Sequence, residues 1–202
     1  MKIICIGRNY IDHAKELNNP VPESPLIFMK PSTALLTDGK PFYYPQFSSD
    51  IQYELELVIK IKKNGKSIAE KFACNYYDEV GLGIDFTARD IQNKLKSSGH
   101  PWELAKAFDY SACIGGFVQK DHLNMQSIRF QLLKDCNVLQ DGDSADMIFS
   151  FDYLIHYISR FITLQTGDLI FTGTPQGVGS IRIGDEFSGL LNGNTLLTCC
   201  VK

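Results

Sequence analysis

The chain has 202 residues, of which 44% are hydrophobic and 21% are charged, and its formal net charge is −3. These values are ordinary for a globular protein and provide no basic surface for nucleic acid. The N-terminus reaches Arg8 after too few apolar residues for a signal peptide. No apolar run approaches the length of about 18 residues that a membrane-spanning helix needs. We therefore expect a cytoplasmic protein that binds neither nucleic acid nor membranes.

The hydrophobic pattern predicts many short strands and few helices. In chain order, the expected elements are a strand at 3–7, a helix at 10–17, strands at 26–29 and 52–62, a turn at 64–65, a strand at 80–85, helices at 87–96 and 150–161, and strands at 168–172 and 185–191. Thr87 and Ser150 are suitable N-cap residues for the two later helices. Asn192-Gly193 is typical of a hairpin turn after the last of these strands.

The order of these elements predicts the fold class. Strands do not alternate regularly with helices, which argues against a doubly wound parallel sheet. No linker, repeat or low-complexity tract divides the sequence. We therefore expect residues 1–202 to form a single, β-rich domain of the α+β class.

Several residue types with chemical potential are interpreted as structural. The six cysteines show no Cys-x-x-Cys spacing, so we expect buried thiols rather than disulfides or a zinc site. Asp141-Gly142-Asp143 is interpreted as a hairpin tip and not as the Asp-x-Asp motif of a phosphatase. No partner pattern accompanies His100, His122 or His156, which we expect to be structural or exposed.

Three acidic residues lie on or beside predicted strands. Glu54 and Glu56 are two residues apart in a strand, so their side chains are expected on the same face. Asp85 closes a later apolar strand. Converging carboxylates beside apolar strands need a neutralising partner, and an all-oxygen ligand set suits Mg²⁺, with Mn²⁺ close behind. The alternative is a half-exposed strand with a charged outer face.

Two pairs of polar residues remain open to two interpretations on local pattern alone. His13 and Glu16 are three residues apart on a predicted helix and therefore share a face. Arg89 and Gln92 have the same spacing on the helix after Asp85. Either face could simply be solvated, or it could contribute to a site.

The same ambiguity applies to a lysine and a glycine-rich segment. Lys106 has mostly apolar neighbours, and its ammonium group could extend to solvent or reach the acidic residues. Residues 172–179 are glycine-rich but lack the Gly-Lys-Ser/Thr of a phosphate loop. They could form a plain turn after a strand or a nest that binds an anion.

Six sequence blocks supply information that local pattern does not. In chain order they are Gly7-Arg8-Asn9-Tyr10, Phe28-Met29-Lys30-Pro31-Ser32, Tyr53-Glu54-Leu55-Glu56-Leu57, Asp85-Phe86-Thr87-Ala88-Arg89-Asp90, Pro101-Trp102-Glu103-Leu104-Ala105-Lys106 and Thr172-Gly173-Thr174-Pro175-Gln176-Gly177-Val178-Gly179. Together the blocks resemble the fumarylacetoacetate hydrolase family, and within it the short acylpyruvase and oxaloacetate decarboxylase branch. The resemblance extends from residue 7 to about residue 189.

The resemblance implies a fold, an assembly and a set of site residues. The fold is a roll of mixed β-sheet around a helix, and the assembly is a homodimer. Mg²⁺, with Mn²⁺ or Ca²⁺ as substitutes, would be bound by Glu54, Glu56 and Asp85. His13 and Glu16 would activate water, and Lys106 would stabilise negative charge. The implied substrate-binding residues are Arg8, Lys30, Arg89, Gln92 and Thr174.

The leading functional hypothesis is Mg²⁺-dependent hydrolysis of the carbon–carbon bond of 3-acylpyruvates through a pyruvate enolate. The alternative is an oxaloacetate decarboxylase, or an isomerase or keto–enol tautomerase, including a 2-hydroxyhepta-2,4-diene-1,7-dioate isomerase. All of these reactions act on a small 2-keto acid and use the same kind of enolate. A non-catalytic metabolite-binding protein is a third hypothesis, and the complete set of acidic and basic residues argues against it.

Overall fold

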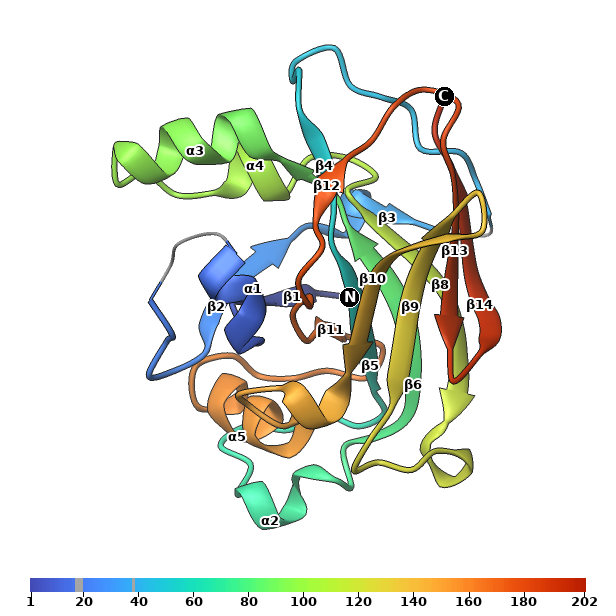
Figure 1. The fold of residues 1–202 in the computed structure, drawn as a ribbon. Helices are drawn as coiled ribbons and strands as arrows, with labels where there is room; N and C mark the ends of the chain where they lie inside the picture. Colours follow the sequence, from blue (N-terminus) through green and yellow to red (C-terminus); the bar gives the residue numbers. More distant parts are fainter. Residues whose placement is uncertain (17–19, 38) are drawn as a thin grey trace.

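A seven-stranded mixed sheet forms the frame of the protein in the computed structural model, which describes residues 1–16, 20–37 and 39–202 (Figure 1). Its strands, in spatial order, are β2 (Leu26–Lys30), β1 (Ile3–Gly7), β11 (Leu169–Phe171), β5 (Leu55–Ile61), β6 (Tyr77–Asp85), β8 (Ala112–Gln119) and β3 (Leu35–Leu36). The pairs β1–β11 and β3–β8 are parallel, and the remaining neighbours are antiparallel.

Two smaller sheets complete the strand-rich fold. The four-stranded antiparallel sheet contains β10 (Asn137–Asp143), β9 (Arg129–Lys134), β13 (Glu186–Leu191) and β14 (Asn194–Cys200). The three-stranded sheet contains β12 (Gly179–Ser180), β4 (Ile51–Tyr53) and β7 (Thr87–Ala88). The four-stranded sheet lies beside β6 and β8, so that the sheets curl into a half-barrel (Figure 1). This arrangement confirms the expected β-rich α+β fold with a mixed-sheet roll.

The helices are short and lie at the ends and sides of the roll (Figure 1). They are α1 (Ile11–Glu16), α2 (Glu70–Ala73), α3 (Arg89–Ser97), α4 (Glu103–Lys106) and α5 (Phe151–Phe161), with 3₁₀ turns at Ser32–Ala34, Lys120–His122 and Ser144–Asp146. The longest, α5, buries Leu154, Ile155 and Ile158 in the main core. Ser150 caps it as expected, because its hydroxyl accepts a hydrogen bond of 3.2 Å from the Tyr153 N–H. None of the described helices is long and apolar enough to cross a membrane.

The strand β5 has apolar packing on both of its faces. Leu55, Leu57 and Ile59 belong to the main core, whereas Val58 belongs to a smaller core with residues of β1 and β11. Burial of each such side chain contributes about 1.5–3 kcal/mol. Glu56 has the same parity as Val58, so its carboxylate lies in the interior rather than on a charged outer face. The alternative of a half-exposed acidic strand is therefore wrong.

Two predicted elements differ from the observed ones, and the end of a third cannot be compared. The strand expected at 52–62 is divided at Glu54, because β4 and β5 belong to different sheets. Thr87 does not cap α3: it pairs with Gln52 of β4 in the extended conformation, and α3 begins at Arg89. Leu17, the expected end of the first helix, lies outside the described residues.

The segment Asp141-Gly142-Asp143 is not a hairpin tip. It forms the end of β10, where Gly142 pairs with Phe130. A Cβ at Gly142 would lie 2.7 Å from the Phe130 ring, so the glycine serves close packing rather than a turn. The tip between β9 and β10 is at Asp135 and Cys136, whose φ angles are 49° and 65°. Residues 64–65 do not form the expected turn: they lie in the long connection between β5 and β6, where Gly65 forms a bridge with Leu164.

The six cysteines carry free thiols: Cys5, Cys113 and Cys199 are buried as expected, whereas Cys74 and Cys200 are half-buried and Cys136 is exposed. His100 and His122 are exposed, and the Nδ1 atom of the half-buried His156 lies 2.7 Å from the Ile68 carbonyl oxygen. These three histidines therefore have the structural or exposed positions that were predicted for them.

Candidate active site

The three acidic residues converge in the interior of the roll. Glu54 lies in the break between β4 and β5, Glu56 lies in β5, and Asp85 ends the neighbouring strand β6. The Asp85 N–H donates a hydrogen bond of 2.8 Å to the Glu54 carbonyl, which aligns the ends of the two strands. One carboxylate oxygen from each residue lies within 4.8 Å of the other two. All three residues are buried, and Asp85 is fully so.

Basic side chains neutralise Glu54 from two sides. The Lys106 Nζ lies 2.8 Å from Glu54 Oε2, and the Arg89 Nη2 lies 2.5 Å from Glu54 Oε1. Burial acts to raise the pKa of Glu54, but the charges of Lys106 and Arg89 outweigh it and hold this pKa well below its usual range. Glu54 is therefore ionised at neutral pH.

Glu56 has the opposite environment. Burial first, and then the charges of Asp85 and Glu54, raise the pKa of its carboxyl group well above the usual value. Its Oε2 accepts one hydrogen bond of 2.7 Å from the Gly173 N–H, which does not offset these effects. A cation close to Glu56 would relieve the repulsion among the three carboxylates.

Lys30 lies behind the acidic residues rather than among the residues that line the pocket. Its Nζ is 2.8 Å from Asp85 Oδ1, but it donates its hydrogen bonds to the Ser111 hydroxyl at 2.9 Å and to nearby backbone carbonyls. The contact with Asp85 is thus one of charge alone, and Asp85 Oδ1 is buried without a hydrogen bond.

These observations fit a hard divalent cation. The donor set is entirely of carboxylate oxygen, which Mg²⁺, Mn²⁺ and Ca²⁺ accept. The repulsion at Glu56 is a feature that a bound cation would relieve. Glu54, Glu56 and Asp85 are therefore the residues that would hold the ion.

Lys106 is buried in the same cluster and does not extend to solvent. Besides Glu54, its Nζ contacts Asp85 Oδ2 at 2.8 Å and the Thr87 hydroxyl. Burial acts to lower the pKa of Lys106, but the charges of Asp85 and Glu54 outweigh burial and raise it. The ammonium group therefore stays charged at the side of the carboxylates.

His13 and Glu16 share one face of α1, as their spacing predicted. The His13 Nδ1 lies 3.2 Å from Glu16 Oε2, while Glu16 Oε1 accepts a hydrogen bond of 3.0 Å from the Gly177 N–H. A carboxylate can only accept hydrogen bonds, so Nδ1 carries the proton and Nε2 has the free lone pair. Burial lowers the pKa of His13 despite the opposing charges of Glu54 and Glu16. The imidazole is thus neutral at pH 7.

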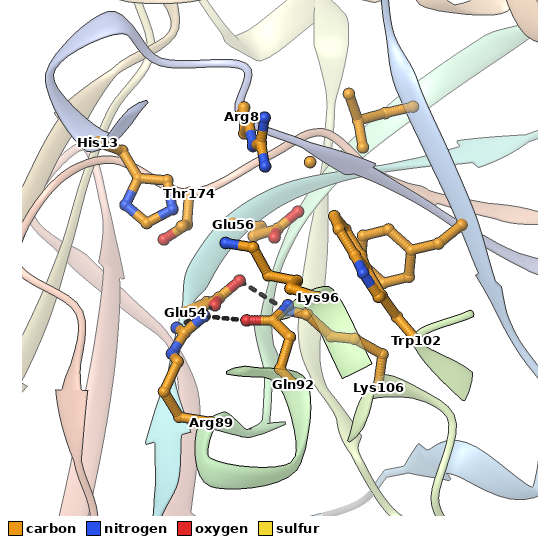
Figure 2. A pocket seen from close by; sticks show the side chains of 13 residues that line it. Arg8, His13, Glu54, Glu56, Arg89, Gln92, Lys96, Trp102, Lys106 and Thr174 are labelled. Atoms are coloured by element: carbon orange, nitrogen blue, oxygen red, sulfur yellow. Dashed lines mark hydrogen bonds and ion pairs between the residues drawn. The ribbon is translucent and has the colours of Figure 1, made fainter. Parts of the chain in front are cut away.

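A single pocket collects most of the predicted site residues (Figure 2). Of the eleven residues proposed from the sequence, eight line it: Arg8, His13, Glu54, Glu56, Arg89, Gln92, Lys106 and Thr174. Glu16, Lys30 and Asp85 do not line the pocket but contact residues that do. Within α3, the Arg89 Nη1 donates a hydrogen bond of 2.6 Å to Gln92 Oε1, so the two residues act as one unit.

Thr174 is fixed by a residue that the sequence did not reveal. The amide of the buried Gln140 donates hydrogen bonds to Thr174 Oγ1 at 2.8 Å and to the Pro175 carbonyl at 3.0 Å. Its carbonyl oxygen accepts a hydrogen bond of 2.8 Å from the Leu55 N–H. Because Thr174 Oγ1 accepts from Gln140, its own proton is available to an acceptor in the pocket. Gln140 directly precedes Asp141-Gly142-Asp143 in a strand that was not predicted, so no sequence signal indicated it.

Other pocket residues were also missed. Lys96 follows Arg89 by seven residues on α3, so the helical period alone would have placed it on the same face. Trp102 lies inside one of the sequence blocks and lines the pocket beside Phe28, with ring centroids 6.0 Å apart. Ser111 supports Lys30 from a segment that had no assigned element.

Comparisons with known proteins agree with this geometry. Residues 2–201 match the family model described as fumarylacetoacetate (FAA) hydrolase C-terminal. The chain is 41% identical over 201 residues to a mitochondrial oxaloacetate tautomerase of Mus musculus, which covers 99% of this chain and 91% of that protein. It is 42% identical over 185 residues to a mitochondrial oxaloacetate decarboxylase of Dictyostelium discoideum, with coverages of 91% and 85%.

A solved structure extends the comparison to a ligand complex. The fumarylpyruvate hydrolase of Pseudomonas aeruginosa, in complex with Mn²⁺ and pyruvate, is 35% identical and superposes with a TM-score of 0.93. The match covers all of this chain and 89% of that one.

Proposed function

Because this chain belongs to the fumarylacetoacetate hydrolase family, we propose that it is a divalent-metal-dependent enzyme that forms an enolate from a small 2-keto acid. Keto–enol tautomerisation of oxaloacetate is the first candidate reaction. The observation that carries the proposal is the meeting of a buried three-carboxylate cluster with a neutral histidine in one pocket. The chemistry of the relatives at 41% and 42% identity supports oxaloacetate as the substrate.

The bound ion would serve as a Lewis acid toward the 2-keto oxygen and one carboxylate oxygen of the substrate. The remaining steps belong to the chain's own residues. His13 Nε2 removes a proton from C3, and the electron pair of the broken C–H bond becomes the C2–C3 double bond of an enolate. The charge of Lys106 stabilises the developing oxyanion. Return of the proton to oxygen completes the tautomerisation with no loss of atoms.

Hydrolysis of 3-acylpyruvates is the second candidate, and one observation favours it. Glu16 orients His13, and this arrangement suits a base that takes a proton from water. Attack of that water on the distal carbonyl, followed by carbon–carbon cleavage, would leave pyruvate as its enolate. The relative solved with Mn²⁺ and pyruvate is a fumarylpyruvate hydrolase, which agrees with such a product. Decarboxylation of oxaloacetate would give the same enolate without water.

A product assay separates these reactions. Three reactions are measured with added Mg²⁺: enol–keto interconversion of oxaloacetate, CO₂ release from oxaloacetate, and pyruvate release from acetylpyruvate. Mg²⁺ without protein is the control. We expect the protein to accelerate enol–keto interconversion of oxaloacetate most strongly. A protein that accelerates no reaction of any short 2-keto acid beyond the metal control would contradict the proposal. The cytoplasmic location expected from the sequence remains a prediction, since two of the relatives named above are mitochondrial.

A further inference from the structure

The amide group of Gln140 connects the strand that carries two of the carboxylates to the turn that carries Thr174. Its oxygen accepts a hydrogen bond of 2.8 Å from the N–H of Leu55, and its nitrogen donates one of 2.8 Å to Thr174 Oγ1. Leu55 lies between Glu54 and Glu56 in the sequence. The Gln140 side chain is only 1% exposed. A single buried side chain thus sets the position of the Thr174 hydroxyl relative to the two carboxylates.

A β-bulge precedes Gln140 and packs against the same turn. The register of β10 with β9 shifts between Val138 and Gln140, so that Leu139 is an extra residue in β10. Bulges re-aim the neighbouring side chains and are common next to active sites. The Leu139 carbonyl oxygen lies close to Gly177, where an added Cβ would be 2.4 Å from it. The bulge therefore brings both the backbone of β10 and the Gln140 amide into contact with the turn that contains Thr174.

The backbone partners of the Gln140 amide fix the direction in which it faces. A backbone N–H can only donate and a backbone carbonyl can only accept, so the amide oxygen faces Leu55 and the amide nitrogen faces Pro175. The nitrogen is therefore the donor to Thr174 Oγ1, and the hydroxyl proton of Thr174 is directed away from the amide. Figure 2 shows Thr174 in the pocket beside His13. The hydroxyl can thus donate into the pocket.

We propose that Gln140 is a positioning residue, which commits the Thr174 hydroxyl to donate its hydrogen bond to a negatively charged oxygen of the substrate. Gln140 does not itself line the pocket, so it acts through Thr174. The proposal rests on the proposed function, in which an anionic 2-keto acid lies in this pocket. A donor whose direction is fixed before the ligand arrives loses less freedom on binding. Loss of the Gln140 amide should therefore weaken binding although the Thr174 hydroxyl remains.

The test is a double-mutant cycle on binding, in which calorimetry of Mn²⁺-loaded protein measures the Kd for pyruvate. Thr174→Val should raise Kd about 10- to 100-fold, the usual cost of a lost hydrogen bond to a charged group. Gln140→Met alone should raise Kd about 3- to 10-fold, as for a neutral hydrogen bond. In the Thr174→Val protein, Gln140→Met should change Kd by less than about twofold, because the hydroxyl to be positioned is gone. In the Thr174→Ser protein, which keeps a hydroxyl, the effect of Gln140→Met should persist.

Two further variants keep the cycle interpretable, and circular dichroism verifies that each protein is folded. Gln140→Asn shortens the side chain by one CH₂ group and withdraws the amide from Thr174, so it should show the same dependence on the hydroxyl. Gln131→Met is the control, because Gln131 is a half-buried glutamine on β9 that does not line the pocket. It should change Kd by less than about twofold. An equal loss from Gln140→Met in all three backgrounds, or no loss in any, would overturn the positioning role.

Turnover of oxaloacetate by the same proteins separates this proposal from the proposed reaction, and KM for oxaloacetate should follow the same cycle as Kd. If wild type turns over no 2-keto acid but binds pyruvate with the expected dependence, the proposed reaction fails and the role of Gln140 stands. If wild type accelerates the reaction and the effects of the variants are additive, the role of Gln140 fails and the reaction stands. A protein that neither binds pyruvate nor acts on oxaloacetate would refute both.

Discussion

At His13, burial and nearby carboxylates act in opposite directions on the imidazole. Burial prevails and lowers the pKa below the ordinary value of 6.5. Only the neutral form can accept a proton, so activity should be present above this lowered pKa and should fall as the pH drops through it. We expect the acidic limb of the kcat/KM profile to have its midpoint below pH 6.5.

The control for this limb is His13→Ala. Loss of a general base typically lowers the rate about 10²–10⁴-fold, and the residual activity should lack the limb. Circular dichroism verifies that the variant is folded. A wild-type midpoint above pH 6.5, or an unchanged limb in the variant, would show that His13 is not the base.

At Glu56, the same kind of burial acts on an acid and raises its pKa. In metal-free protein at pH 8, Glu56→Gln should therefore increase the free energy of unfolding by about 1 kcal/mol or more, because it removes a repelled buried carboxyl group. At a pH below the unfolded-state pKa, which is near 4.5, the carboxyl group is neutral in both the folded and the unfolded state. The gain in stability should therefore vanish there. Chemical denaturation of wild type and variant in EDTA, at pH 8 and at a pH below about 4.5, measures this difference in stability.

The exposed Glu186→Gln serves as the matched control, and its stability should change by less than about 0.5 kcal/mol at either pH. With metal present, Glu56→Gln should lose activity although it is more stable. A variant that is less stable than wild type in EDTA at pH 8 would refute the proposed repulsion.

At the level of elements, the turn after β11 connects the three carboxylates of Glu54, Glu56 and Asp85 to the rest of the pocket. Gly173 has a φ of 102°, its N–H donates to Glu56, and a Cβ there would lie 2.7 Å from the Asn9 Cβ. Gly173→Ala should therefore displace both the N–H group that donates to Glu56 and the turn that contains Arg8 and Asn9. We expect a loss of at least 2 kcal/mol in stability, which combines the left-handed strain with overpacking, and a large loss of activity.

Gly193→Ala separates the two causes, because its φ of 82° is also left-handed but nothing lies within 4 Å of the added Cβ. This variant should lose about 1–2 kcal/mol of stability and keep full activity. Chemical denaturation and kinetics of the two variants test the difference. Equal effects in both would mean that backbone strain alone, and not the contact with Asn9, matters at Gly173.

The observed elements also show which parts of the structure could be predicted from sequence. Strong apolar runs such as β5 and β6 were found because burial on a sheet face leaves a clear hydrophobic pattern. The strands β8, β9 and β10 were missed because few of their residues are buried, and because glycines or charged residues interrupt their apolar pattern. Gly142 was misread because it pairs with Phe130 of the preceding strand β9 and lies within a strand rather than a turn. Thr87 was misread because pairing with Gln52, distant in sequence, overrides its local cap preference.

The site residues also fall into two groups, those that the sequence indicated and those that it did not. The carboxylates and His13 could be proposed from spacing and from the family resemblance. Gln140 and Ser111 could not, because their roles depend on contacts with residues 34 and 81 positions away in the chain.

At the scale of the whole molecule, several large apolar side chains remain on the surface. Tyr43, Leu104 and Ile183 are 67%, 71% and 72% exposed. Such side chains could contribute to an interface between two copies of the chain. We expect sedimentation at micromolar concentration to give about twice the chain mass of 22.7 kDa. A single species with the mass of one chain would contradict the homodimer.

The requirement for a divalent ion at Glu54, Glu56 and Asp85 can be tested in a single assay. The rate of enol–keto interconversion of oxaloacetate is measured with protein stripped by EDTA and again after Mg²⁺ or Mn²⁺ is restored, with the free ion alone as the control. We expect the protein-dependent rate to vanish in excess EDTA and to return with the ion. A full protein-dependent rate in excess EDTA would contradict the claim.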